Sequence, residues 1–373
     1  MNKFLLTLSW ALFVLVLFLY LFATNNNNNY FVGRIGLLYS RFSAQQRFAT
    51  RTVVSHGKEH EVEWNSELSL HTINGKPVLW LFWHKKPLPA HIKFSLATVA
   101  CHNRENLHLE VVSEAEIANW IGKVHPAFQY LIPIHKADYF RLQILAQYGG
   151  MYLDVDTVVL HNLKLLFNKL RNFDVVNTDW EPDGDIIGFP NMGPVRANTK
   201  LLTGAAKKQD DVLDLKLTAL KNHSQGKGSY PVEWTEILGS VTVPLAVELL
   251  NNNSFQYYKI NGSATSGQLI VASLLPGKIL NQTHQVEIAD TELLVYYNSG
   301  MNSSIGNMSD HQFLQSNMLL PSLIRFSMQQ CRQTKEPEKN SVKNESLRIG
   351  ENVDKIDKKL IEFIADYATK LEF

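Results

Sequence analysis

One stretch of this chain, from His135 to Asn162, joins a helical pattern to a buried strand through two adjacent glycines. Before the glycines, apolar side chains recur at the spacing of one helix face. Gly149–Gly150 is expected to end that helix, since glycine adopts the left-handed conformation common after a helix C-terminus. The segment Met151–Leu153 then predicts a buried strand. The apolar helix positions are Ala137, Phe140, Ile144 and Tyr148.

Two carboxylates, Asp154 and Asp156, follow this strand directly. If the strand continued, both side chains would lie on one side, with Val155 opposite. Carboxylate oxygens suit Mn²⁺ or Mg²⁺, and such an ion also binds nucleotide phosphates. A D-x-D pair is also common in solvated turns. However, an apolar run that leads into two acids is costly unless something pairs with them, so we predict a metal and phosphate site here.

Asp138 and Arg141 stand three residues apart on the preceding helix and therefore share a face. They would form either a surface ion pair or part of a binding site. In a binding site, Arg141 would face a phosphate, and Asp138 would face a ribose, a base or an acceptor. The sequence leaves both interpretations open.

The residues Leu153–Val158 also match the D-x-D-x-T/V nucleophile motif of haloacid-dehalogenase-type phosphatases, in which the first aspartate attacks phosphorus. That fold needs a later lysine and a second acidic pair after another apolar strand. The available pair, Asp210–Asp211, follows the polar segment Lys207–Gln209, which is typical of a helix surface. A phosphatase is therefore the second enzymatic hypothesis.

The region before the central stretch predicts a Rossmann-like α/β sheet. Val78–Trp83 is a continuous apolar run, as expected for a central parallel strand, and a helix at Ala90–His102 and a strand at Leu107–Val112 follow. Ligands gather at the carboxyl ends of such strands. Trp83 and His84 lie at such an end and are candidates to contact a nucleotide base, with a core tryptophan and a loop histidine as the alternative.

The remaining pattern is weaker. Residues 179–194 predict a loop near the site, in which Asp185 is the candidate acceptor contact. The apolar stripe between Val353 and Leu371 predicts a terminal helix. We expect this helix to pack on the body of the protein, and the alternative is that it mediates weak self-association. Other expected helices are 201–220, 235–250 and 311–330, the last broken near Pro321, and other expected strands are 174–177, 255–260 and 293–297.

Phe4–Ala23 is a run of twenty uncharged residues, long enough to span a bilayer, with a cleaved signal peptide as the alternative. Lys3 precedes the run and no charge follows until Arg34, which predicts a cytosolic N-terminus and a lumenal body.

Cys101 and Cys331 would either pair in an oxidising compartment or remain buried thiols. The sequence holds seven N-x-S/T sequons, at Asn222, Asn252, Asn261, Asn281, Asn302, Asn307 and Asn344.

A formal charge of +1 over 373 residues gives no electrostatic reason to expect nucleic-acid binding. The chain is expected to divide into a cytosolic tail (1–3), a transmembrane anchor (4–23), a partly disordered stem (24–75), a catalytic domain (76–332) and a charged linker with a C-terminal helix (333–373).

The block from Asp138 to Asp156 resembles the D-x-x-R-x-x-x-L-x-x-x-G-G-x-Y-x-D-x-D pattern of the sugar-transferase DXD superfamily. This is the group of family-32-like glycosyltransferases that includes α-1,4-galactosyltransferases, α-1,4-N-acetylglucosaminyltransferases and capsular polysaccharide enzymes. The resemblance extends over roughly residues 76–331 and is strong only in the central block. Residues Trp80–Trp83 and Pro87–Pro89 also resemble that family's first strand and loop.

The resemblance implies a GT-A fold, a nucleotide-sugar donor, Mn²⁺ (or Mg²⁺), and transfer with retention to a glycan or glycolipid acceptor. It also implies a type II protein of the Golgi membrane. Asp154 and Asp156 match its metal and nucleotide site, and Asp138 and Arg141 its donor-site acid and base. Tyr152 matches a packing position and is also a candidate substrate-binding residue. Vertebrate members carry His-x-Trp-Asn near the C-terminus, where this chain has Val295–Asn298 without histidine. A catalytically weak, membrane-anchored binding protein of the same fold is therefore a further alternative.

Overall fold

The apolar run that was predicted to be a central strand forms β4 (Lys76–Trp83), around which the main sheet is built. β4 pairs in parallel with β5 (His108–Ser113) and with β6 (Gly150–Tyr152). Its side chains alternate between two cores. Val78, Trp80 and Phe82 face one core, and Leu79 and Leu81 face the other, so the strand is covered on both sides, as predicted.

In this computed structural model the described residues are 50–84, 87–177, 193–233, 235–259, 286–288, 294–296, 305, 307–316, 318–335, 347–349 and 358–369. Residues Thr52–Phe373 form one unit. The predicted anchor at Phe4–Ala23 and the candidate Asp185 lie outside the described ranges. Within those ranges no helix has the length and apolar character needed to cross a membrane.

The main sheet is mixed, with the strand order β1-β2-β3-β4-β6-β9-β8-β10 and with β5 also paired to β4. β2, β3 and β4 follow one another antiparallel, β9 runs antiparallel to β6 and β8, and β10 is parallel to β8. The bounds are β1 (Arg51–Ser55), β2 (Lys58–Asn65), β3 (Leu70–Ile73), β8 (Val175–Asn177), β9 (Pro194–Val195) and β10 (Tyr257–Lys259).

The prediction of a partly disordered stem over residues 24–75 is wrong for residues 51–73. These residues form β1, β2 and β3, which belong to the main sheet. Their polar and charged side chains hid an alternation in which Val53, Val62 and Ile73 point into the core beside β4. One-sided burial normally gives a clear apolar–polar alternation, but in β1 and β2 the buried apolar positions are only Val53 and Val62, too few to show it.

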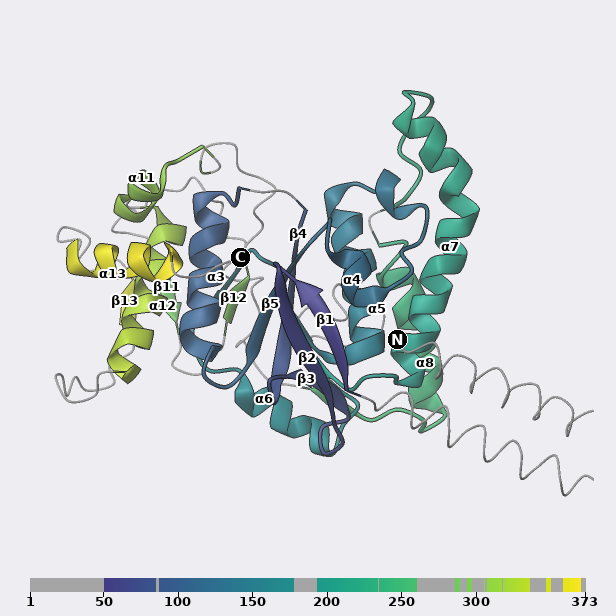
Figure 1. Ribbon diagram of the computed structural model, residues 1–373, viewed down its shortest axis with the longest axis horizontal. Helices are drawn as coiled ribbons and strands as arrows, with labels where there is room; N and C mark the ends of the chain where they lie inside the picture. The colour runs from purple at the N-terminus through teal and green to yellow at the C-terminus, as the bar shows by residue number, and fades with distance from the viewer. Residues whose placement is uncertain are drawn as a thin grey trace, which may run out of the picture. The chain divides into compact units, whose positions relative to one another are not determined.

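Helices cover both faces of this sheet (Figure 1). One face carries α4 (Ile117–Ile121), α5 (Pro133–Tyr148), α7 (Lys200–Ser224) and α8 (Gly239–Asn251). The other face carries α3 (Ala90–Asn103) and α6 (Lys164–Asn168). Two short 3-10 turns complete these layers, η1 (Phe128–Tyr130) and η2 (Lys169–Arg171). The predicted helix at 235–250 begins four residues later than expected, at Gly239.

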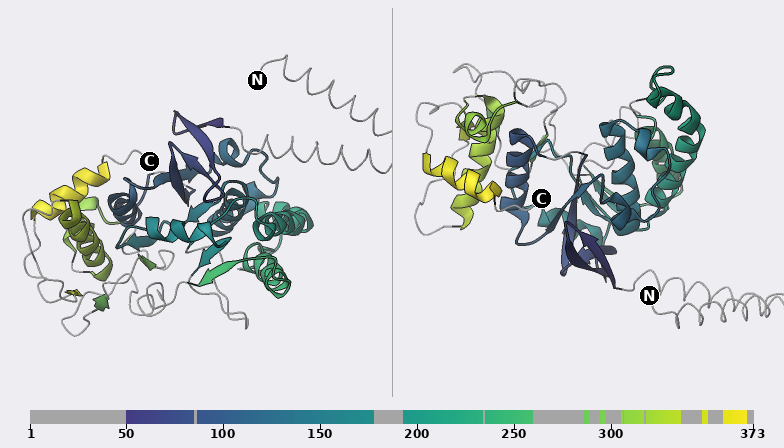
Figure 2. Two further views of the ribbon diagram at one scale, coloured as in Figure 1. Left: turned by 90° about the horizontal axis from the view of Figure 1, so that it is seen from below. Right: turned by 45° about the horizontal axis from the view of Figure 1, so that its top comes forward.

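A further layer packs on the outer side of α3, as the two views of Figure 2 also show. It contains α11 (Asp310–Gln315), α12 (Leu319–Lys335) and α13 (Lys358–Thr369). Leu360, Ile361 and Ile364 of α13 are buried there, which confirms that the terminal helix docks on the body. Four short strands make two small sheets, in which β7 (Thr157–Val159) pairs with β12 (Leu294–Tyr296) and β11 (Val286–Ile288) with β13 (Leu347–Ile349).

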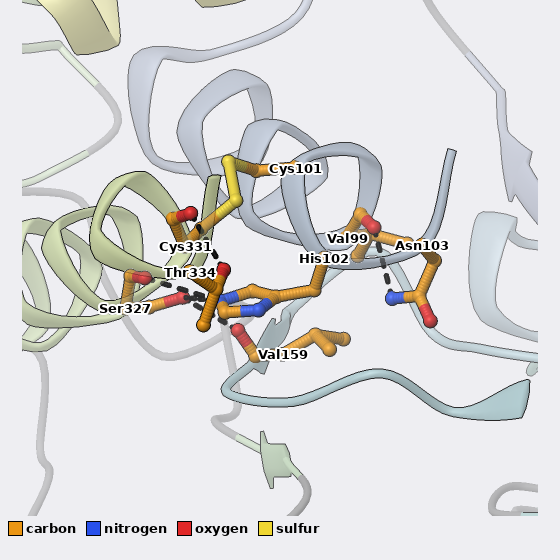
Figure 3. Close-up of a disulfide and its surroundings, with 8 residues drawn as sticks. All are labelled: Val99, Cys101, His102, Asn103, Val159, Ser327, Cys331 and Thr334. Carbon is orange, nitrogen blue, oxygen red and sulfur yellow. Dashed lines mark hydrogen bonds between the residues drawn. A yellow bond between two sulfur atoms is a disulfide. The ribbon is translucent and has the colours of Figure 1, made fainter. Parts of the chain in front are cut away.

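The two cysteines form a disulfide, Cys101–Cys331, which joins α3 to α12 (Figure 3). Beside it, Nε2 of His102 lies 3.1 Å from the backbone oxygen of Ser327 and 3.2 Å from the Ser327 hydroxyl. The single helix expected at 311–330 is instead divided into α11 and α12. Pro321 lies in the first turn of α12, where its missing N–H removes no helical hydrogen bond.

Candidate functional site

The glycine pair between α5 and β6 fixes the geometry of the candidate site. Both residues have positive φ, 66° at Gly149 and 96° at Gly150, which side chains rarely tolerate. A Cβ on Gly150 would lie 2.7 Å from the backbone oxygen of Val78 and 2.9 Å from Nε1 of Trp80. That nitrogen donates a 2.9 Å hydrogen bond to the Gly149 carbonyl. The glycines therefore allow α5 to end directly against β4 and β6.

Arg141 lies at the centre of a charged cluster built from α5 and the end of β6. Its Nη2 donates a 2.6 Å hydrogen bond to Oδ1 of Asp154 and lies 3.6 Å from Oδ1 of Asp138. Its guanidinium carbon lies 4.5 Å from the centre of the Tyr152 ring. Arg141 is 4% exposed and Asp138 is 7% exposed. Of the two interpretations that the sequence left open, the surface ion pair is therefore excluded.

Burial dominates the electrostatics of Asp138. It raises the pKa of the Asp138 carboxyl to about 6, and the negative charge of Asp154 adds to the increase, while the Arg141 guanidinium opposes it. Burial also raises the pKa of the Tyr152 phenol. The cluster therefore holds one cation among carboxyl groups, one of which titrates near neutral pH.

The second carboxylate of the D-x-D pair does not lie on a strand. β6 ends at Tyr152, and Val155–Asp156 form a turn before β7. The expectation that strand alternation places Asp154 and Asp156 on one side is therefore wrong, because neither residue lies on a strand. Asp154 and Asp156 are both partly exposed, whereas Val155 is buried in the core on the α3 side.

The donor atoms at this position fit a hard divalent cation, because Mn²⁺ and Mg²⁺ take carboxylate oxygens. Nη2 of Arg141 contacts Oδ1 of Asp154 at 2.6 Å. A cation bound here would share Asp154 with Arg141. The arginine would then also hold the carboxylate in position.

Tyr152 was predicted to contact substrate, but it is only 1% exposed. Its ring packs beneath the Arg141 guanidinium, so its place in the structure is that of a support for this side chain.

Trp83 and His84 lie at the carboxyl end of β4, as predicted, with ring centres 5.1 Å apart. Trp83 packs against the core on the α3 side, whereas Tyr152 belongs to the core on the α5 side. Among the residues described, the buried indole nitrogen of Trp83 has no hydrogen-bond partner. A buried N–H donor without a partner is unusual, and the contact of Trp83 and His84 with a nucleotide base stays a prediction.

A second pair of side chains lies near Asp138 and could not be recognised from the sequence. On α5, His135 lies one turn before it, and Nδ1 of His135 lies 2.7 Å from the hydroxyl of Tyr230. Their rings stack with centres 5.5 Å apart. Tyr230 comes from the segment after α7, so no local spacing connects it to Asp138. Burial raises the pKa of the Tyr230 phenol, and the negative charge of Asp138 adds a smaller increase.

The acidic pair that a phosphatase would need, Asp210–Asp211, lies within α7. Asp210 faces the side chain of Gln143 on α5, with Oδ1 3.4 Å from Nε2. This pair therefore follows no strand, in agreement with the helical pattern of its sequence.

Comparison with known proteins identifies the region that contains this cluster. Residues 47–176 match the family described as "Glycosyltransferase sugar-binding region containing DXD motif". The matched DXD region includes Asp138, Arg141, Asp154 and Asp156, and it also covers β1 to β3, which had been predicted to be a stem.

Curated relatives match a shorter segment. Lactosylceramide 4-alpha-galactosyltransferases of Pan troglodytes and Homo sapiens are each 35% identical over 88 residues, or 22% of this chain and 24% of the relative. The chain thus spans about a quarter of the length of these relatives. Among solved structures, the apo form of the glycosyltransferase GlyE of Streptococcus pneumoniae TIGR4 aligns with a TM-score of 0.35 and 16% identity, covering 70% of this chain and 64% of that one.

Proposed function

We propose that this chain is a retaining glycosyltransferase of GT-A architecture, which transfers a sugar from a nucleotide-sugar donor to a glycan or glycolipid acceptor. The observation that carries the proposal is the Asp138–Arg141–Asp154 cluster at the carboxyl end of β6, in which Asp138 and Arg141 are buried. The match of residues 47–176 to a DXD glycosyltransferase region supports it. So does the mixed α/β sheet, because ligands of such sheets bind at the carboxyl ends of the strands.

In this proposal, Asp154 and Asp156 hold Mn²⁺ or Mg²⁺. Such an ion, when bound, offsets the negative charge of a departing diphosphate. Arg141 fixes the orientation of Asp154 through its 2.6 Å hydrogen bond and places a positive charge beside the phosphates. The ring of Tyr152 packs against the Arg141 guanidinium and supports its position.

The donor and the acceptor would contact other residues around the cluster. Asp138 would bond to a donor hydroxyl, and Trp83 and His84 would contact the nucleotide base. Asp185 is the proposed acceptor contact. The departing phosphate would accept the proton of the acceptor hydroxyl, so that transfer on the same face of the sugar requires no separate protein base.

The proposed setting is the Golgi membrane, with residues 1–3 cytosolic, an anchor at 4–23 and a lumenal body. The Cys101–Cys331 disulfide supports an oxidising lumen. The catalytic domain would begin near Thr52, with strand β1, and not at residue 76 as expected from the sequence. It would end near residue 332.

The test is a screen of the purified full-length chain in detergent, with Mn²⁺, against a panel of nucleotide sugars. We expect hydrolysis of one nucleotide sugar even without an acceptor, and we expect Asp156→Ala to abolish it. The matched control is Asp214→Ala, because Asp214 is an exposed acid on α7 that pairs with His125. Donor binding without turnover would favour the binding protein, and release of phosphate from simple esters would favour the phosphatase.

A further inference from the structure

A second group of metal-ligand side chains lies away from Asp154 and surrounds Glu110 on β5. Glu110 is a buried carboxylate, only 2% exposed. Within the described ranges its ion-pair partners are three histidines, His56, His60 and His108. A carboxylate buried without a lysine or arginine is costly unless other groups compensate its charge.

Two of the histidine nitrogens converge on one oxygen of this carboxylate. Nε2 of His108 lies 3.1 Å from Oε2 of Glu110, and Nε2 of His60 lies 4.0 Å from the same atom. The three ligand atoms all lie within 4.8 Å of one another. The other carboxylate oxygen, Oε1, accepts a 2.6 Å hydrogen bond from the Ser55 hydroxyl. One oxygen is therefore oriented by the protein, and the other faces the two imidazoles.

The His60 nitrogen gives an independent indication of a ligand. Its Nε2 is buried and has no hydrogen-bond partner in the part of the chain that the structure describes. A separation of 4.0 Å from Oε2 is too long for a hydrogen bond. Two ligands of one zinc ion lie roughly 3–4 Å apart, because each bond is about 2.1 Å long. An ion between these atoms would provide the missing partner.

The strands explain why these side chains meet. His108 and Glu110 are two residues apart on β5 and therefore point to the same face of the sheet. His60 lies on β2, and its ring meets that of His108 edge-on, with centres 5.4 Å apart. Trp120 of α4 closes one side, with its ring centre 6.0 Å from that of His60. His56 is already engaged, since its Nε2 lies 2.8 Å from the backbone oxygen of Val111.

We propose that His60, His108 and Glu110 bind a divalent transition-metal ion, and that Zn²⁺ suits this ligand set best. Two imidazoles and one carboxylate are a common zinc ligand set that leaves a fourth position for water. The ion would fasten the β1–β2 hairpin to β5 and neutralise Glu110. The Asp154–Asp156 pair differs in chemistry, because its donors are all oxygen, which suits Mn²⁺ or Mg²⁺.

The two sites also lie at different places in the sheet. Glu110 is in register with Trp80 of β4, and so is Tyr152 of β6, the residue at which β6 ends. β5 and β6 are separate partners of β4. Asp154 comes after the end of β6, whereas His108 lies two residues before Glu110, in register with Val78. One ion cannot serve both sites.

The experiment uses the full-length chain in detergent, stripped of metal with a chelator, in an Asp154→Asn/Asp156→Asn background that removes the other candidate site. Zn²⁺ alone is titrated by calorimetry, and thermal unfolding is followed with and without Zn²⁺. We expect one equivalent of Zn²⁺ to bind and to raise the Tm. Co²⁺ in its place should give the visible absorption of a four-coordinate ion.

In the same background, His60→Gln should weaken Zn²⁺ binding at least roughly tenfold and remove the rise in Tm, since a primary ligand is lost. The control is His223→Gln, whose imidazole bonds to the Gly228 carbonyl on the surface, and it should bind Zn²⁺ as the background does. If near-UV circular dichroism shows that His60→Gln is not folded, His108→Gln makes the same test at a partly exposed residue. Absence of Zn²⁺ binding, or equal binding by the ligand and control variants, would overturn the proposal.

Discussion

Replacing Asp138 with asparagine isolates the effect of burial on one carboxyl group. In the folded protein its pKa is raised to about 6, from an ordinary value of 3.8. Between these two values the folded protein retains a proton that the unfolded chain has released, so stability falls as the pH rises through this window. One pKa unit corresponds to about 1.4 kcal/mol, so the loss amounts to about 3 kcal/mol by pH 7.

The assay is urea unfolding of the wild type and of Asp138→Asn at pH 4, 5, 6 and 7, with a chelator present. Asparagine has no charge to bury, so the stability of the variant relative to the wild type should rise by about 2–2.5 kcal/mol from pH 4 to pH 7, because a small part of the loss has already occurred by pH 4. Leu142→Val, a buried apolar change on the same helix, is the control and should shift stability equally at every pH. A difference between Asp138→Asn and wild type that stays constant with pH would show that the carboxyl is not buried beside Asp154 as described.

Three further variants test other parts of the structure. Arg141→Met leaves two carboxyl groups without their cation, so it should lower the free energy of unfolding by about 3–5 kcal/mol in urea, and unchanged stability would contradict the buried cluster. Gly150→Ala should lower the free energy of unfolding by clearly more than the roughly 1–2 kcal/mol expected from its positive φ alone, because the new Cβ would collide with the backbone oxygen of Val78. Gly57→Ala, with positive φ and open space around it, is the matched control, and equal losses would refute the close approach. Cys101→Ser with Cys331→Ser should lower the free energy of unfolding by about 2–5 kcal/mol, because the bridge closes a loop of 230 residues, and a chain as stable as wild type would contradict the linkage of α3 to α12.

The parts of the fold that could be predicted from sequence are those with a strong local period. β4 is a continuous apolar run, and α3 and α5 are long enough for their helical character to be clear. The glycine pair was also informative, since its positive φ values and close contacts follow from the absence of a side chain.

The β1–β3 strands could not be predicted because their buried positions are few and separated by charged residues. Val53 and Val62 become core residues only when the hairpin folds against β5 and α4. No property of residues 51–65 alone indicates that surface. The same reason explains the cluster around Glu110, since His60 and His108 are distant in sequence and meet only through this packing.

The candidate site was predicted in part. Asp138, Arg141 and Asp154 meet because a helix and a strand flank one turn, and the local sequence encodes both elements. The orientation of Asp156 depends on the turn at Val155–Asp156, which the strand pattern did not reveal. Tyr230 is brought to His135 by the packing of α7 on α5, a contact between segments far apart in the chain.

The most direct test of the proposed function is donor hydrolysis by the full-length chain as a function of Mn²⁺, measured for wild type, Asp156→Ala and the Asp214→Ala control. We predict that wild type and control release nucleoside diphosphate from one nucleotide sugar only when Mn²⁺ is present. Asp156→Ala, still folded, should release none. Full activity of Asp156→Ala, or turnover that does not depend on a divalent cation, would contradict the proposal that this acidic pair is the donor site.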